Sequence, residues 1–217
     1  MVVRVRRAHT RRALVTVARG LFAEQGYAGT SLEEVVAGAE VTKGALYHHF
    51  RGKQELYAEV LAQVEDDARS RIRARIEDVA DPWERALVGL REFLTIAQGQ
   101  EYRRIVILEG PAVLGYERFR EQESGSTFGL VHDIVAGLLQ PYDLPASTLT
   151  AFTRLFYGAM STTASAVAQA PDPEQAAEET EGAVVLVLAG IRSLLEEGGA
   201  ARGADRVDDR EEPPVSP

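Results

Sequence analysis

The sequence predicts an all-α protein in which a small three-helix head is joined by a long helix to a larger helical body. Apolar residues recur at helical spacing along most of the 217-residue chain, as amphipathic helices require. Glycines and prolines mark the breaks between these segments, several of them beside residues that cap helices. No segment alternates apolar and polar residues as a half-buried strand would.

Residues 11–52 are predicted to form the head, after a basic N-terminal arm at residues 1–10. The first helix has an apolar face and ends at a pair of glycines, and a capping-box sequence that begins with Ser31 starts the second helix. Thr42 can cap the third helix, which follows the second after a very short turn. Three short helices with a tight turn before the last are typical of a helix-turn-helix module, whose last helix enters the major groove of DNA.

The expected third helix, at residues 42–50, suits a DNA groove. Leu46 and Phe50 lie four residues apart and can bury one face, while side chains that carry hydrogen-bond donors project at other angles. The first turn holds no carboxylate, although the helix dipole favours one there. The start of this helix is therefore open to a phosphate.

Residues 53–199 are predicted to form the body. A long helix from Lys53 to about Val79 would span roughly 40 Å and run from the head into the body. Asp-Pro pairs start two of the later helices, and glycines or prolines separate the others. Residues 200–217 have almost nothing to bury, and we predict that they are disordered. The later helices are expected near 83–98, 101–109, 115–139, 146–169 and 173–197.

The composition restricts the class of protein. Cysteine is absent, so the chain forms no disulfide and no thiolate site, which suits the reducing cytoplasm in which we expect the protein to act. The longest apolar run, residues 183–189, is much shorter than the roughly 20 residues of a membrane-spanning helix. The first dozen residues lack the apolar stretch of a secretory signal. We therefore expect no membrane association.

Charge is divided unevenly along the chain. Of the formal net charge of −9, residues 1–56 contribute +4 and the remaining residues −13. A basic head on an acidic body is expected if only the head meets a polyanion such as DNA. The arginines of the first dozen residues, taken alone, are equally consistent with a solvated tail.

The sequence contains no motif for catalysis or cofactor binding. The acidic clusters lie on polar helix faces, whereas paired catalytic acids must converge in a cleft. A serine-hydrolase elbow, a phosphate loop and a dinucleotide fingerprint are all missing. His48 and His49 would point about 100° apart on a helix and could not chelate one metal ion. We expect no enzymatic activity, no metal and no cofactor.

Residues 11–56 resemble the DNA-binding head of the TetR-type (tetracycline-repressor) transcriptional regulators. The body resembles that family only in size and helical character. Glu40 departs from the family pattern, which usually has a turn glycine there, and so does Val36, where a small alanine is common. The matching residues are Ala18 to Phe22, Gly26-Tyr27, Thr30-Ser31, Val35, Ala39, Val41 to Phe50, Lys53 and Leu56.

The resemblance implies which residues of the head contact DNA. Lys43 and Gly44 would lie near base edges. Lys43 and Lys53 each stand in the first turn of a helix, where a cation opposes the helix dipole, and an arriving phosphate would relieve that misfit. The residues implied at phosphates are Thr30, Ser31, Thr42, Tyr47, His48 and Lys53.

The last two helices are predicted to form a dimer interface. Residues 184–191 are apolar on nearly every side and should be buried on two faces, one of them against a partner subunit. The resemblance likewise implies a four-helix interface. A two-fold dimer would place its recognition helices roughly 34 to 36 Å apart, or a multiple of that, on a pseudo-palindromic operator. The predicted interface residues are Ala159, Thr163, Val184, Val187, Leu188, Ile191 and Leu195.

A pocket for an apolar or amphipathic small molecule is expected between the middle helices of the body. Glu109, His132 or Tyr157 would supply its polar groups, and His132 could also sense pH. The alternative is that these residues are ordinary core. A bound effector would push the long helix and weaken operator binding roughly 5 to 150-fold. The other predicted lining residues are Phe93, Tyr102, Ile105, Val106, Phe119, Phe128, Phe152, Phe156 and Met160.

Together these features predict a sequence-specific DNA-binding transcriptional regulator, a homodimeric repressor that a small-molecule effector releases from its operator. The alternative is a helical small-molecule-binding protein whose head docks a protein partner. A steep loss of duplex affinity with salt would separate the two functions.

Overall fold

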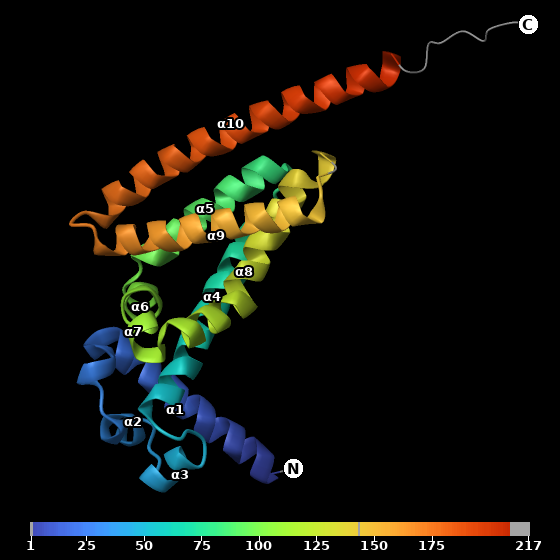
Figure 1. The fold of residues 1–217 in the computed structure, drawn as a ribbon. Helices are drawn as coiled ribbons and strands as arrows, with labels where there is room; N and C mark the ends of the chain where they lie inside the picture. Colours follow the sequence, from blue (N-terminus) through green and yellow to red (C-terminus); the bar gives the residue numbers. More distant parts are fainter. Residues whose placement is uncertain (1, 143, 209–217) are drawn as a thin grey trace, which may run out of the picture.

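The computed structural model describes residues 2–142 and 144–208, and within those ranges its regular elements are all helices (Figure 1). This confirms the predicted fold class of a three-helix head, a long helix and a helical body. The elements are α1 (Val2–Gly29), α2 (Leu32–Gly38), α3 (Lys43–Tyr47), α4 (Lys53–Ile76), α5 (Pro82–Gln98), α6 (Gln100–Tyr102), the π-helix η1 (Arg103–Leu108), α7 (Gly110–Leu114), α8 (Tyr116–Leu139), the short 3-10 helix η2 (Gln140–Tyr142), α9 (Ala146–Gln169) and α10 (Pro173–Asp208).

The head consists of α1, α2 and α3, which pack around one apolar cluster. Phe22 of α1, Val35 of α2 and Leu46 of α3 meet there and are fully buried. The helix α1 begins at Val2, so the residues predicted as an N-terminal arm continue the first helix of the head.

The helices α2 and α3 begin with the caps that the sequence predicts. Ser31 Oγ accepts a hydrogen bond from the Glu34 N–H, and the Glu34 carboxylate accepts from the Ser31 N–H, which completes a capping box. Thr42 Oγ1 accepts from the Ala45 N–H. Glu40, in the turn between the helices, has φ 53. This left-handed conformation favours glycine, the residue that the family pattern has at that position.

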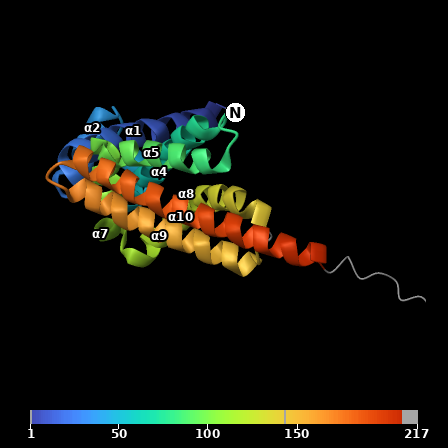
Figure 2. The same cartoon turned by 90° about the horizontal axis from the view of Figure 1, so that it is seen from above.

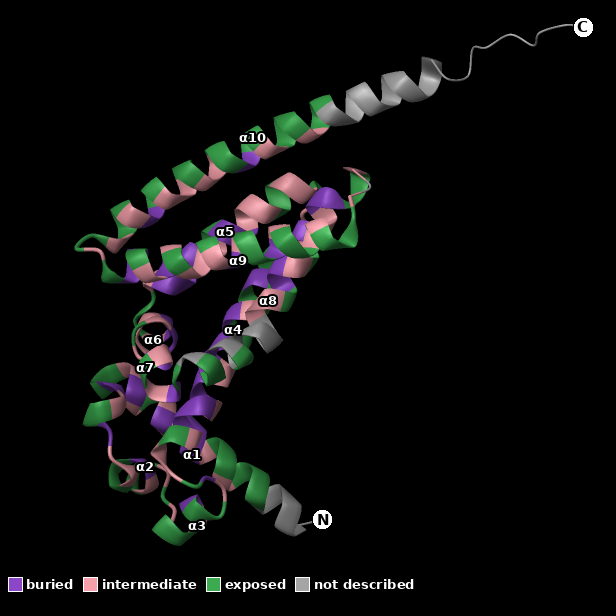
Figure 3. Cartoon of the chain, in the orientation of Figure 1, coloured by how far each residue is buried: buried purple, intermediate pink, exposed green. Residues whose placement is uncertain are grey.

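The helix α4 joins the head to the body as predicted, and much of its length is buried (Figures 1 and 3). Its apolar residues belong to one continuous buried cluster, from Leu56 beside the head to Ile76 inside the body. The helix ends at Ile76, slightly before the expected end near Val79. The head and the body therefore share one rigid, buried element.

In the body α5 and α8 pack against α4, α9 packs against both α5 and α8, and α10 lies along both α5 and α9 (Figures 1 and 2). The helix expected at 101–109 is divided into α6 and η1. The helix α10 continues to Asp208, so residues 200–208 are helical and not disordered as predicted, whereas residues 209–217 of the predicted tail lie outside the described residues. Among the described helices, none is both long and apolar enough to span a bilayer.

Candidate DNA interface and effector cavity

The helix α3 turns its polar face to solvent at the end of the head that lies away from α10 (Figure 1). Leu46 and Phe50 are buried in the core of the head, as their spacing predicts, and this orients the rest of the helix outward. Tyr47 is 52% exposed, which is unusual for so large a ring and leaves it free to contact a partner. We call the exposed residues the α3 surface: Thr42, Lys43, Gly44, Tyr47 and His48.

Lys43 forms an ion pair with Glu33 of α2. The hydrogen bond from Lys43 lowers the pKa of the Glu33 carboxyl, and the same bond raises the pKa of Lys43. Both side chains are exposed, and ion pairs between exposed groups are weak. Lys43 is therefore able to exchange Glu33 for a DNA phosphate or base.

Thr30 and Lys53 are turned inward, contrary to their expected place at phosphates. Thr30 is 2% exposed, and its Oγ1 donates to the Gly26 carbonyl at 2.8 Å. Lys53 Nζ donates to the carbonyls of Tyr27 at 2.7 Å and Thr30 at 2.8 Å, and it lies 4.4 Å from the centroid of the Tyr27 ring. Two backbone carbonyls thus accept hydrogen bonds from the Lys53 ammonium. The local sequence does not reveal these contacts. Ser31 is partly exposed, but its hydroxyl serves the cap of α2.

The fold adds α1 to this end of the head. The Arg11 guanidinium lies 5.3 Å from the centroid of the Phe50 ring and donates to Glu59 at 2.5 Å. Burial lowers the pKa of His49, and the neighbouring charges of Arg7 and Arg11 add to that shift. The arginines in the first dozen residues indicated a basic arm, but only the packing of α1 shows that Arg7 and Arg11 lie near His49 and Phe50, which directly follow α3.

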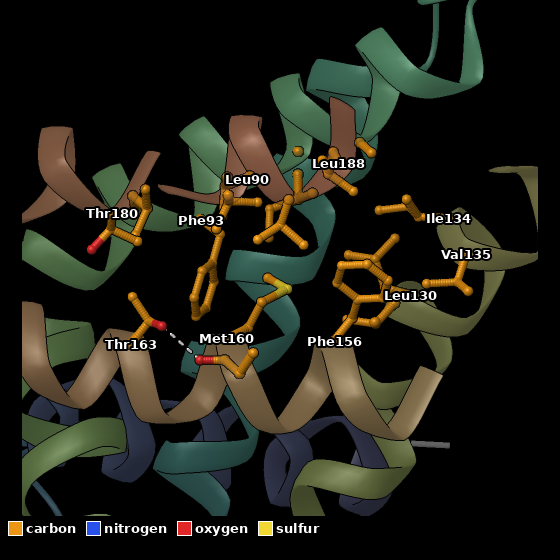
Figure 4. Close-up of a pocket in the computed structure, with 18 of the residues that line it drawn as sticks. Leu90, Phe93, Leu130, Ile134, Val135, Phe156, Met160, Thr163, Thr180 and Leu188 are labelled. Atoms are coloured by element: carbon orange, nitrogen blue, oxygen red, sulfur yellow. Dashed lines mark hydrogen bonds between the residues drawn. The ribbon is translucent and has the colours of Figure 1, made fainter. Parts of the chain in front are cut away.

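A cavity of about 210 Å³ lies in the body between α4, α5, α8, α9 and α10 (Figure 4). The described residues that line it are apolar except for Thr127, Thr163 and Thr180, and none of them is charged. Thr163 Oγ1 donates to the Ala159 carbonyl and Thr180 Oγ1 to the Ala176 carbonyl, each at 2.7 Å, so both donors are used within their own helices. The cavity therefore offers apolar contact and little polar recognition.

Three of the predicted pocket residues, Phe93, Phe156 and Met160, line this cavity. A smaller space of about 120 Å³ lies beside it, and Phe93 borders both spaces. The other predicted residues that border the smaller space are Tyr102, Val106 and Phe119.

The remaining predicted aromatic and aliphatic residues lie outside both spaces, and so does Tyr157, one of the expected polar groups. Phe128, Phe152 and Tyr157 belong to an apolar cluster between α8 and α9, other members of which line the cavity, and the Phe128 and Tyr157 rings meet edge-on with centroids 5.5 Å apart. Ile105 is fully buried in the cluster that contains α4. An apolar pattern predicts burial for all of them, but it does not distinguish a packed core from a cavity wall.

The two ionisable groups expected in the pocket, Glu109 and His132, lie elsewhere. Glu109 accepts a hydrogen bond from the Tyr27 N–H at 2.7 Å and pairs with Arg104, at the junction between head and body. The His132 side chain is 43% exposed, and its Nδ1 lies 3.8 Å from Asp133. Both residues differ from their expected positions for one reason. Apolar neighbours in the sequence do not show whether a polar side chain points into a pocket or toward another part of the fold.

Most of the predicted dimer-interface residues of α9 and α10 border the cavity, and two of these, Ala159 and Val187, are also exposed to solvent. Leu195 packs into the apolar cluster that holds Phe152, and Ile191 is partly buried. An apolar run such as 184–191 does not show which of its faces turns to the core. The predicted interface residues that line the cavity are Ala159, Thr163, Val184, Val187 and Leu188. Large apolar side chains that these two helices expose are Leu155, Leu186, Val187 and Leu194.

Known proteins resemble both parts of the chain. Residues 14–60 match the bacterial regulatory proteins of the tetR family, and residues 83–191 match the tetracyclin repressor-like C-terminal domain. The Transposon Tn10 TetC protein of Escherichia coli is 30% identical over 137 residues, which cover 63% of this chain and 69% of TetC. The HTH-type transcriptional repressor KstR2 of Mycobacterium tuberculosis is 33% identical over 99 residues, which cover 46% of this chain and 49% of KstR2.

A solved structure extends the likeness to most of the fold. The crystal structure of a TetR-family transcriptional regulator from Pectobacterium atrosepticum is 30% identical, has a TM-score of 0.75, and covers 86% of this chain and 96% of its own. Regulators of this family bind operator DNA and typically act as dimers with small-molecule effectors. The relatives lend no support to a head that docks a protein partner. With its exposed α3 surface and matches to both parts of the fold, the chain belongs to the TetR family and is a DNA-binding transcriptional regulator.

Proposed function

We propose that the protein is a repressor that binds a pseudo-palindromic operator as a two-fold homodimer and leaves it when a small uncharged molecule fills the cavity. The observation that carries this proposal is the separation of the exposed α3 surface from the cavity, with α4 running between them (Figure 1). DNA and effector do not compete for one site, so they influence each other through the fold. The place of action would be the cytoplasm, where operator DNA lies.

The exposed apolar face of α9 and α10 supports a second copy of this chain as the partner. Leu186 is 75% exposed and Leu194 is 71% exposed, both on α10, and Leu155 of α9 is 64% exposed. Apolar side chains gathered on one face mark an interaction surface more often than scattered ones do. A two-fold pairing of α9 and α10 would bury these side chains in a four-helix interface.

The lining of the cavity supports an uncharged and largely hydrocarbon effector. An ionised ligand would lose its hydration there, and the described lining residues offer no opposite charge in return. The hydroxyl donors of Thr163 and Thr180 are already used within their helices. Of the two effector classes that the sequence allows, the apolar one therefore fits better than an amphipathic molecule with a charged group.

A salt titration of operator binding tests the DNA-binding part of the proposal. Duplexes that the purified full chain retains from a random library supply the operator, and fluorescence anisotropy measures its Kd. The logarithm of the affinity should fall with the logarithm of salt concentration, by about 0.9 per phosphate contact. Lys43→Ala should flatten that slope by about one unit and relax base preference, whereas Arg85→Ala, an exposed arginine of α5, should leave both unchanged. No enrichment of any duplex would contradict the proposal.

The same titration with naphthalene, an uncharged bicyclic hydrocarbon, tests the class of effector. Naphthalene should raise the operator Kd by about 5 to 150-fold, whereas 2-naphthoate, which adds a carboxylate to the same ring system, should have little effect. Met160→Lys places an ammonium in the cavity wall and should abolish the response to naphthalene. Equal release by the two compounds would contradict an uncharged effector.

A further inference from the structure

A backbone break interrupts α1 at Gly26, and side chains of the body hold the chain there. Gly26 has φ 77 and ψ 175, which is not helical, so α1 is kinked there, a few residues before the chain reaches α2. The N–H of the next residue, Tyr27, donates to Glu109 Oε2 at 2.7 Å. Before the break, the carbonyl of Glu24 accepts from Arg104 Nη1 at 2.8 Å. Two side chains of the body thus hold the backbone on both sides of the break.

These two side chains also contact each other directly beside Gly26, which has no side chain. Arg104 Nε and Glu109 Oε1 form an ion pair at 3.4 Å. A Cβ placed on Gly26 would collide with Glu109 Oε1 and lie 3.0 Å from Arg104 Nη2. Glycine at position 26 therefore makes room for the pair. We call Arg104, Glu109 and the backbone of residues 24–27 the clasp.

The body end of the clasp is anchored in the core. Arg104 lies in η1 and Glu109 directly follows it, and the wide π-helical turn joins them by a bond from the Glu109 N–H to the Arg104 carbonyl at 3.1 Å. The carbonyl of Ile105, inside the same turn, accepts from the buried Tyr57 hydroxyl of α4 at 2.7 Å. The two charged groups consequently have little freedom to move relative to α4.

The head end of the clasp is also held. Lys53, in the first turn of α4, donates to the carbonyls of Tyr27 and Thr30. The segment 26–30 is therefore bonded to the clasp at its start and to α4 along its length. Because α2 and α3 follow this segment directly, a rotation at the break would carry the α3 surface with it.

We propose that Arg104 and Glu109 are positioning residues that fix the angle of the head on the body, and that they thereby select the spacing between operator half-sites. This inference rests on the proposed binding of operator DNA by a two-fold dimer. In such a dimer, the distance between the recognition helices depends on where each body holds its head. A loosened clasp lets the two heads fit more than one spacing and so reduces selectivity for spacing.

Operators with one or two base pairs inserted or removed between the half-sites test this role. We expect the wild-type chain to bind the altered spacings at least about tenfold more weakly, a loss comparable with that for a mismatched base pair. In Glu109→Ala the ratio of the Kd for an altered spacing to the Kd for the original spacing should fall to about threefold or less. Glu109→Gln keeps an acceptor for the Tyr27 N–H and should retain most of the wild-type ratio.

A matched control is Glu92→Ala, which breaks an ion pair of 2.6 Å between Glu92 and Arg71, on α5 and α4, and should leave the spacing ratio unchanged. A merely stabilising role for the clasp would weaken binding to every spacing alike, so an unchanged ratio in folded Glu109→Ala overturns the proposal. If circular dichroism shows that Glu109→Ala is unfolded at the assay temperature, Arg104→Gln carries the same test, because it retains the hydrogen bond from the Tyr27 N–H to Glu109. Failure of the wild-type chain to bind any spacing would overturn the proposed function instead.

Discussion

Directional polar bonds join the head to the body in addition to the apolar packing along α4, whereas mainly apolar contacts surround the cavity. At the junction, Arg19 of α1 donates to both carboxylate oxygens of Glu101 at 2.6 Å, in addition to the clasp. At the cavity, α10 closes the space with the side chains of Ala183, Val184 and Leu188. Hydrogen bonds weaken steeply when their angles change, while apolar contacts are not directional. The junction is therefore suited to fixing an angle and the cavity wall to adapting its shape.

Phe93 connects these two regions. It lines the cavity, and its ring meets Tyr102 edge-on with the centroids 6.4 Å apart. Tyr102 directly precedes η1, which carries Arg104 of the clasp. The smaller space beside Phe93 leaves room for its ring to move. A displacement of Phe93 by an effector would thus reach the clasp through the Tyr102 ring and the backbone that leads into η1.

The largest expected effect of a single substitution lies at the junction. Gly26→Ala should lower the free energy of unfolding by about 3 kcal/mol, because the combination of φ 77 and ψ 175 is essentially restricted to glycine. The added Cβ would also collide with Glu109. Urea denaturation followed by circular dichroism measures this loss. A loss below about 1 kcal/mol would show that the junction adapts as easily as the cavity wall.

A smaller loss is expected at Gly110, where the segment that carries the clasp packs against the core. A Cβ there would lie 2.8 Å from Phe119 Cε2 and 2.9 Å from Leu61 Cδ1. Both neighbours are buried, and relieving such crowding requires shifts in side chains or backbone. Gly110→Ala should therefore lower the free energy of unfolding by about 2 kcal/mol, measured in the same urea titration. An unchanged midpoint of denaturation would contradict tight packing at the junction.

Local patterns predicted the helices and the exposed face of α3, because burial and capping leave marks within a few residues. The helix expected at 146–169 has those bounds in the structure, and the predicted cap at Asp81 accepts a hydrogen bond from the Glu84 N–H at 2.8 Å. Apolar side chains recur every third or fourth residue wherever a helix packs on a core. The start of a helix likewise depends on one residue and its near neighbours.

The contacts of the junction could not be predicted in this way. Glu109 bonds to Tyr27, which lies 82 residues earlier, and a carboxylate amid apolar neighbours has the same local pattern whether it faces a pocket or another segment. Lys53 also has the sequence context of an exposed helix start, although carbonyls of the head surround its ammonium. Such roles depend on how separate segments meet, which periodicity does not encode.

The smallest expected effect lies at the cavity and has the opposite sign. Gly89 of α5 lines the cavity, and a Cβ there would make ordinary contacts, 3.5 Å from Ile134 Cδ1 and 3.6 Å from Ile76 Cγ2. Alanine has less conformational freedom to lose on folding than glycine, so Gly89→Ala should raise the free energy of unfolding by about 0.5 to 1 kcal/mol in the urea titration. The same added methyl group would then destabilise the protein at Gly110 and stabilise it at Gly89. Losses of similar size at both positions would mean that the cavity wall is packed as tightly as the junction.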